Sequence, residues 1–179
     1  MNPQDLLATA PERIREHRTA EVDLRLVDRN GAPLPNLRAR AQLVRHAFKF
    51  GCNAFLLSGG AEASLQEAYE ERFAALLNYA TLPYYWGRYE PSPGETIQNR
   101  LRDMAAWCAR HRIATKGHPL VWHEVYPAWG DSYRDSEILA RLEKRVHEVV
   151  STFKGSVDIW DVVNEATVSH RFDNAIGRW

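Results

Sequence analysis

The sequence predicts an α/β fold, the first part of a (β/α)₈ barrel, and three observations support this fold class. From residue 48 onward, short apolar runs alternate with runs whose apolar residues recur at helical spacing. The apolar runs are nearly continuous, as in parallel strands that are buried on both faces. Histidine, tryptophan, asparagine and glutamate residues stand at or directly after the ends of these runs, and the carboxyl ends of the strands are where such barrels carry their active sites.

Residues 1–46 differ from the rest and are expected to form an appendage of one short helix and a small β-hairpin. Residues 21–28 and residues 37–46 each alternate between apolar and polar side chains, as half-buried strands do. Between them stands the pair Asn30–Gly31, which is a strong signal for a hairpin turn. We therefore expect the hairpin to lead into the main domain.

The main domain, residues 47–179, is predicted to run β-α-β-α-β-α-β. The expected strands are residues 48–55, 79–86, 114–122 and 157–163, and the expected helices begin near Ser64, near Asn99 and at residue 136. A complete TIM barrel needs about 250 residues. The chain is therefore expected to hold about the first four βα units, and to be a fragment whose C-terminal part is missing.

The composition argues against several classes of function. The 23 basic and 23 acidic side chains balance, and no basic stripe stands out, so nucleic acid is not an expected partner. No apolar stretch reaches the roughly 18–20 residues that span a membrane. The N-terminus lacks the basic start and apolar run of a secretory signal, which leaves the compartment open. Cys52 and Cys108 lack metal-site spacing and are expected to be free thiols, with a single disulfide as the alternative.

The first candidate for chemistry is the run from Asp158 to Glu165, in which a buried strand delivers Asn164 and Glu165 to its carboxyl end. Desolvation among aromatic side chains favours the neutral form of a carboxyl group, which can then act as an acid. The amide of Asn164 can hold a sugar hydroxyl. The alternative is that Glu165 only caps the next helix or makes a surface ion pair.

The second candidate is the run from Lys116 to Trp129, where two histidines and two tryptophans crowd one strand end. His118 and His123 are five residues apart, so on a strand their side chains face opposite ways. This geometry and the lack of HExxH spacing argue against a metal site. For either histidine, the alternative is a satisfied residue of the core.

The third candidate is the run from Tyr84 to Gly94, which places four aromatic residues within six positions after a strand. Tyr85 and Trp86 are the candidate sugar contacts in this run, because aromatic rings suit the flat apolar faces of sugars. The alternative is an aromatic plug that closes the mouth of the barrel.

Together these three segments resemble glycoside hydrolase family 10, the endo-1,4-β-xylanase family. The matching motifs are Trp86 with Glu90-Pro-Ser-Pro-Gly, then Gly117 to His123, then Trp160 to Glu165, and the resemblance covers roughly residues 46–179. It implies a retaining hydrolase with a polysaccharide or oligosaccharide substrate of the xylan type. It also implies a secreted or periplasmic protein that needs no cofactor, because two carboxyl groups suffice for the chemistry.

The resemblance also implies a role for each matching residue. Glu165 aligns with the general acid/base, and Asn164 aligns with the residue that holds the 2-hydroxyl of the sugar being cleaved. His118 and Trp122 align with sugar contacts beside the cleavage point. His123 aligns with a histidine in a supporting position.

Two departures from the family pattern alter what is expected of the chain. Thr81 and Leu82 stand where the family has Glu-Asn, and Tyr85 stands where it has lysine. These changes suggest altered glycone subsites, with another β-glycan or a decorated xylan as substrate. The nucleophilic glutamate belongs to a later strand, beyond Trp179. We therefore expect this chain to be inactive by itself, and the rival function is a non-catalytic glycan-binding protein with a degenerate family 10 cleft.

Overall fold

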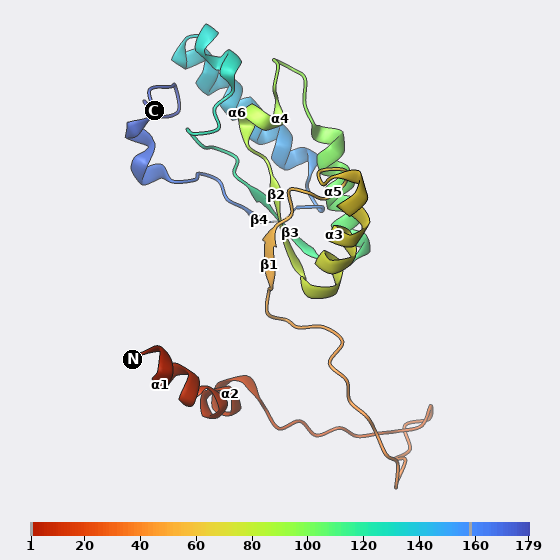
Figure 1. Ribbon diagram of the computed structural model, residues 1–179. Helices are drawn as coiled ribbons and strands as arrows, with labels where there is room; N and C mark the ends of the chain where they lie inside the picture. Colours follow the sequence, from red (N-terminus) through yellow and green to blue (C-terminus); the bar gives the residue numbers. More distant parts are fainter. Residues whose placement is uncertain (1, 158) are drawn as a thin grey trace. The chain divides into compact units, whose positions relative to one another are not determined.

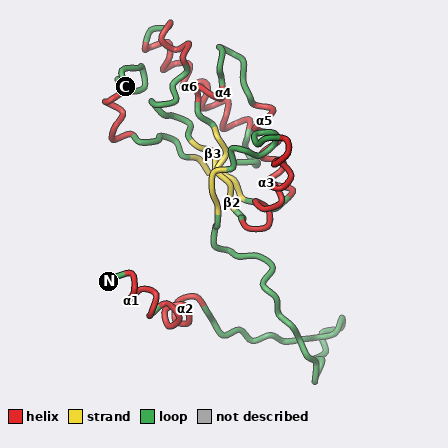
Figure 2. The backbone as a smooth tube through the Cα atoms, viewed as in Figure 1, coloured by secondary structure: helices red, strands yellow, loops and turns green. Residues whose placement is uncertain are grey.

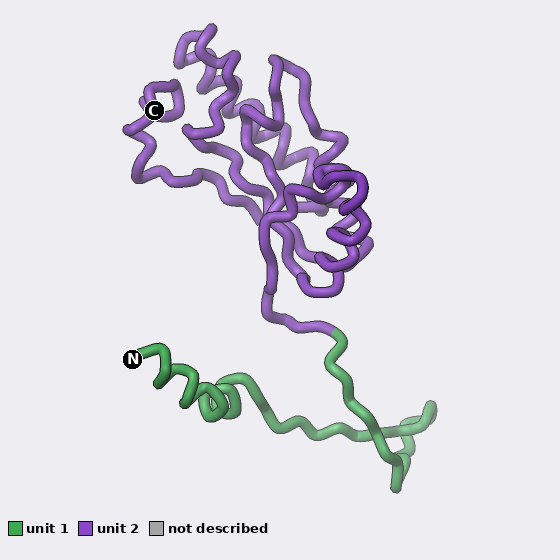
Figure 3. Tube along the Cα trace, in the orientation of Figure 1, with its two compact units in different colours: residues 1–44 green, residues 45–179 purple. Residues whose placement is uncertain are grey.

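The computed structural model describes residues 2–157 and 159–179, and the chain divides into two units, Met1–Val44 and Arg45–Trp179 (Figure 3). The first unit begins with two short helices, α1 (Pro3–Ala8) and α2 (Ala10–Arg18). Asn2 caps α1, because its side-chain oxygen accepts a hydrogen bond from the backbone N–H of Asp5 at 2.8 Å. Of the helices in the described ranges, none is long and apolar enough to cross a membrane.

The hairpin expected in residues 21–46 is reduced to its turn. The Asp28 carboxylate accepts two hydrogen bonds from backbone N–H groups of the turn, 2.8 and 2.9 Å long, and Val27 forms a single antiparallel bridge with Pro33. The two strands expected on either side do not form. Their alternating apolar side chains lie exposed, as Val22 does at 73%. A two-stranded ribbon with no covered face is only marginally stable in water.

The second unit contains a four-stranded parallel sheet in which each strand pairs with the next along the chain (Figure 1). The strands are β1 (Gly51–Asn53), β2 (Tyr79–Pro83), β3 (Ala114–His118) and β4 (Ile159–Trp160). The long helices that connect them are α3 (Ala63–Leu76), α5 (Gln98–Arg110) and α6 (Asp135–Thr152). Short helical turns complete the unit, namely α4 (Trp86–Tyr89), η1 (Ala128–Ser132) and η2 (Ala166–Arg171). Figure 2 shows this alternation of strand and helix along the chain.

The predicted fold class is confirmed, because sequential parallel strands joined by helices are the wall of a (β/α) barrel. The predicted strands all lie at their expected places but are shorter than expected. The helices α3 and α5 begin one residue before Ser64 and Asn99, so neither residue caps its helix, and neither helix has a side-chain cap. An apolar stripe locates a helix better than its first residue, because the ends depend on local hydrogen bonds.

The core lies between the sheet and the helices. Tyr84, which is fully buried, packs its ring edge-on against Phe153 at 5.1 Å and against Trp160 at 4.8 Å between centroids. Gly117 pairs in register with Trp160. A Cβ at Gly117 would stand 2.2 Å from a ring carbon of Trp160, so only glycine fits beside this ring.

We expect Gly117→Ala to lower the free energy of unfolding by about 1–3 kcal/mol, because the added methyl group displaces the Trp160 ring from a packed core. Urea unfolding followed by circular dichroism measures the change. Ser151→Ala is the control, since Ser151 is exposed on α6. Unchanged stability of Gly117→Ala would show that the Trp160 ring is not tightly held.

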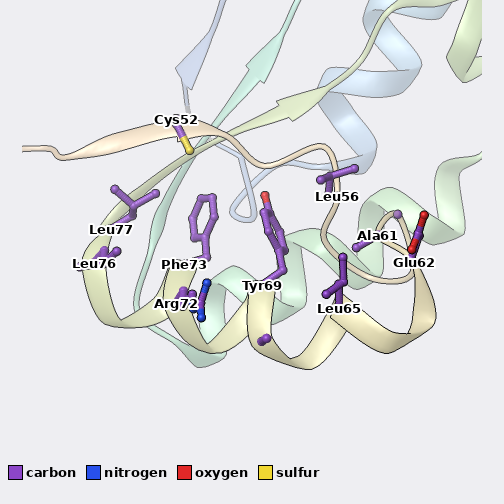
Figure 4. Close-up of a pocket in the computed structure, with 12 residues that line it drawn as sticks. Cys52, Leu56, Ala61, Glu62, Leu65, Tyr69, Arg72, Phe73, Leu76 and Leu77 are labelled. Atoms are coloured by element: carbon purple, nitrogen blue, oxygen red, sulfur yellow. The ribbon is translucent and has the colours of Figure 1, made fainter.

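Both edges of the sheet present apolar surface within the part of the chain that the structure describes. Beyond β4, Val162 and Val163 are 56% and 47% exposed. Along β1 and α3 there is an apolar pocket of about 660 Å³, into which Tyr69 and Phe73 project (Figure 4). In a closed barrel such edges are covered by neighbouring units, so the open sheet leaves adhesive surface exposed.

We expect the purified chain to self-associate through these edges. Light scattering should give a mass above the 20.5 kDa of one chain, and Val162→Lys should reduce association because a charged edge opposes strand pairing. Val150→Lys is the control, since Val150 is exposed on α6. A monodisperse monomer would contradict this expectation.

Candidate active site

Four of the predicted site residues lie together at the carboxyl ends of the strands. Tyr85 follows β2, and its ring centroid lies 5.5 Å from that of His118, at the end of β3, and 5.4 Å from that of Trp122. The indole N–H of Trp122 donates a hydrogen bond of 3.2 Å to the carboxylate of Glu165, which follows β4. Three strand ends thus bring an exposed carboxyl group beside a cluster of rings, although Glu165 is 80 residues from Tyr85 in the sequence.

The chain leaves β4 through a left-handed turn at Glu165. Its φ of 51° and ψ of 40° are uncommon for a residue other than glycine, and such conformations cluster at functional sites. Glu165 stands at the N-cap position of η2, but its side chain makes no capping hydrogen bond. The helix-cap alternative is therefore wrong. The preceding Asn164 is anchored by its backbone N–H, which donates to the carbonyl of Val121 at 2.9 Å.

An ion-pair network that the sequence interpretation missed holds His118. The carboxylate of Asp161, directly after β4, contacts Nδ1 of His118 at 2.7 Å and Nζ of Lys116 at 2.8 Å. Burial raises the pKa of Asp161, but the hydrogen bonds from Lys116 and His118 outweigh it and the net shift is downward. With Nδ1 engaged, Nε2 is the imidazole nitrogen left for a ligand. The signal was present as charged residues inside two strand motifs, but pairing them requires the register of β3 and β4.

Phe55 is a second residue that sequence reasoning missed. Its ring lies edge-on to Tyr85 with 5.7 Å between centroids, and it extends the ring cluster toward β1. Phe55 ends an apolar strand and was indistinguishable from a core residue in the sequence.

The phenol of Tyr85 has a raised pKa. Burial raises this pKa, Arg88 lowers it, and the carboxylates of Glu124 and Glu165 raise it, with a net upward shift. The phenol is thus a neutral hydrogen-bond donor at ordinary pH.

Trp86 and His123 are each only 2% exposed and do not present their rings at the open surface of this cluster, although the His123 ring lies behind that of Trp122 with 6.3 Å between centroids. The indole N–H of Trp86 donates to the Glu90 carboxylate at 2.9 Å. The ring of His123 packs against Phe172 at 4.2 Å between centroids. Both side chains lie beneath the rim in this structure, so their role as sugar contacts stays a prediction.

In the described residues, the side chains that could bind a metal ion do not gather in one place, and the two cysteines are unpaired. In residues 2–157 and 159–179, no group of three histidine, cysteine, aspartate or glutamate side chains gathers as a metal site would require. Cys52 is an exposed free thiol and Cys108 a buried one, so the alternative of a disulfide is wrong. The chemical groups of the site are therefore a carboxyl group, an imidazole, a phenol and aromatic rings.

Comparison with known proteins shows which proteins the chain resembles. Residues 43–176 match the model of glycosyl hydrolase family 10. Endo-1,4-beta-xylanase B of Thermotoga neapolitana is 54% identical over 83 residues, which are 45% of this chain and 24% of that protein. Anti-sigma-I factor RsgI6 of Acetivibrio thermocellus is 28% identical over 172 residues, which are 94% of this chain and 22% of that protein.

Solved structures agree with the family match. Xylanase 10B from Thermotoga petrophila, crystallised in complex with xylobiose, superposes with a TM-score of 0.56 at 28% identity, covering 71% of this chain and 39% of that one. Native xylanase 10B from Thermotoga maritima gives a TM-score of 0.56 at 29% identity, covering 66% and 36%. The chain thus spans between 22% and 39% of the length of these four proteins.

We expect the stabilisation of the fold by the Asp161 network to be complete above about pH 4 and to decrease below it. The folded-state pKa of Asp161 is lowered from 3.8, so its contribution is present above that value and is lost as the pH falls through the folded pKa. Asp161→Asn should cost less than about 1 kcal/mol at pH 6, because the side chain is about a third exposed, and less at pH 2 than at pH 6.

Urea unfolding of both proteins at pH 6 and at pH 2 measures this difference. Asp103→Asn is the control, since Asp103 is exposed on α5. An equal effect of Asp161→Asn at both pH values would contradict the network.

Proposed function

The chain belongs to glycosyl hydrolase family 10, and we propose that it supplies the acid/base part of a retaining endo-1,4-β-xylanase-type active site. The observation that carries the proposal is the exposed carboxyl group of Glu165 at the end of β4, beside the rings of Trp122 and Tyr85. The proposed substrate is xylan or a related β-1,4-glycan. The xylobiose bound to the Thermotoga petrophila relative supports an oligosaccharide ligand. Because xylan is an extracellular polymer, we place the activity in a secreted or periplasmic protein.

In the proposed mechanism, Glu165 protonates the glycosidic oxygen while a second carboxylate attacks the anomeric carbon. The two carboxyl groups of a retaining enzyme lie about 5–5.5 Å apart, and Glu165 then acts as the base that activates water. We assign the nucleophile to a later strand of the barrel, outside the four strands that the structure describes. The hydrogen bond from Trp122 to Glu165 orients the acid. Because Glu165 is exposed in the open sheet, its desolvation requires the rest of the barrel and the substrate.

The other site residues receive roles that follow from their position. We assign the sugar 2-hydroxyl to the amide of Asn164 and a neighbouring hydroxyl to His118, whose ring Asp161 orients. The exposed parts of Tyr85 and Trp122 stack on sugar faces. Trp86 and His123 are proposed to support these residues from beneath the rim.

The glycone side is where we expect the substrate to differ from ordinary xylan. Thr81 is 9% exposed and Leu82 is fully buried, so neither can grip a hydroxyl as the family's Glu-Asn does. Tyr85 supplies a ring and a neutral phenol where the family has a cation. Relative rates on aryl β-xylobioside and aryl β-cellobioside distinguish a xylanase from a hydrolase of another β-glycan.

A non-catalytic glycan-binding function is the second candidate. The observation that favours it is the match over 94% of the chain to a protein named as an anti-sigma factor, not as a hydrolase. The ring cluster suffices for binding, whereas hydrolysis needs the second carboxylate. Binding of xylan by the completed barrel without bond cleavage would favour this function.

We expect the 179-residue chain alone to release no reducing sugar from xylan, because we assign the nucleophile to a later strand of the barrel. Fusion to the second half of the barrel of endo-1,4-beta-xylanase B from Thermotoga neapolitana should restore hydrolysis. Glu165→Gln in that fusion should lower kcat/KM by about 10²- to 10⁴-fold, the usual contribution of a general acid. A reducing-sugar assay measures each rate.

Glu124→Gln is the matched control for this experiment, because Glu124 is an exposed glutamate near Tyr85. It should leave the rate of the fusion unchanged. Two results would overturn the proposal. One is hydrolysis by the chain alone that Glu165→Ala abolishes. The other is a fusion whose activity survives Glu165→Gln.

A further inference from the structure

Arg145, on α6, is a buried cation that the proposed mechanism does not use. Arg145 is only 4% exposed. Its guanidinium donates hydrogen bonds to two backbone carbonyls, that of Leu120 at 2.6 Å and that of Tyr84. No carboxylate of the described residues forms an ion pair with it. Burial lowers the pKa of Arg145 to about 10, so it remains charged at neutral pH.

Burying an unpaired charge is costly, and an apolar side chain of similar size often serves stability equally well. Part of the cost is offset by rings, since the guanidinium carbon lies 5.8 Å from the Trp86 centroid and 5.2 Å from that of Tyr89. Nε of Arg145 still has no partner. Stability alone therefore does not explain why a guanidinium is buried here, and its hydrogen bonds to the two carbonyls point to a different role.

The two carbonyls stand where the chain leaves the sheet toward the site. The carbonyl of Tyr84 belongs to the peptide bond that leads directly to Tyr85, and Leu120 precedes Trp122 by two residues. The backbone N–H of Tyr84 also donates to the carbonyl of His118 at 2.7 Å. One guanidinium thus ties together the segments that carry three residues of the site.

We propose that Arg145 is a positioning residue that holds the segments after β2 and β3 together, so that the Tyr85 ring lies between His118 and Trp122. Its importance for glycan binding rests on the proposed function, whereas its effect on the two segments does not. Arginine suits this role because its planar fork bonds two acceptors at once. Lysine presents a single nitrogen and does not replace that geometry.

Hydrogen–deuterium exchange of the full chain, read by mass spectrometry, tests the positioning role. In Arg145→Lys we expect about tenfold faster exchange in residues 84–90 and 119–126, with exchange in α3 unchanged. Arg141→Lys is the matched control, because Arg141 is exposed one turn earlier on α6 and stacks on Tyr133 at 4.4 Å. Unchanged exchange in the two segments, or an equal increase throughout the chain, would overturn the proposal.

A second variant and a second measurement keep the test decisive. If Arg145→Lys does not fold, Arg145→Met fills the space without a buried charge, and the same local increase is expected. Calorimetry of the fusion described above with xylotetraose should show about tenfold weaker binding in Arg145→Lys and unchanged binding in Arg141→Lys. If the fusion with the unaltered chain does not bind xylotetraose, the proposed function fails, while the exchange data still decide whether Arg145 positions the two segments.

Discussion

Parallel pairing of consecutive strands is the constraint on which the site depends. Because β2, β3 and β4 run in the same direction and pair in chain order, their carboxyl ends meet at one rim. Tyr85, Trp122 and Glu165 each follow a different strand, and only this pairing brings them into contact. The same register places Lys116 and His118 on the face of the sheet that Asp161 reaches. A shift of one residue in β4 would turn Asp161 to the opposite face.

Different contacts hold the site on the two faces of the sheet. On one side, Asp161 receives His118 and Lys116 and orients the imidazole. On the other side, Tyr84 packs against Phe153 and Trp160, while its carbonyl accepts a hydrogen bond from Arg145. Charged groups thus hold the rim from both faces of the sheet, and the aromatic packing of Tyr84 lies on the side of Arg145. On that side, the half-buried rings of the site rest on groups that are themselves buried.

The open edges of the sheet connect the fold to the chemistry. The apolar surfaces beyond β4 and along α3 are those that further βα units cover in a closed barrel. Closure would also exclude water from Glu165, which stands exposed beside Trp122 in this chain. The same event would thus bury apolar surface and desolvate Glu165, so the proposed activity and the stability of the barrel depend on one another.

The order of strands and helices, and the segments that end at the rim, could be predicted from the sequence alone, because hydrophobic period and residue type are local properties. The sequence also singled out Glu165, His118 and Trp122 by their places in the family motifs, and Tyr85 by its place in a run of aromatic residues after a strand. The alternation of apolar and polar side chains predicted strands in residues 21–46 that do not form, because no packed layer covers their apolar face. Other contacts could be found only in the folded chain. Asp161 pairs with His118, and Phe55 belongs to the ring cluster. Trp86 and His123 are buried, and Arg145 donates hydrogen bonds to two carbonyls. These contacts join residues up to 61 positions apart, and their partners depend on strand register and helix packing, which no local pattern encodes.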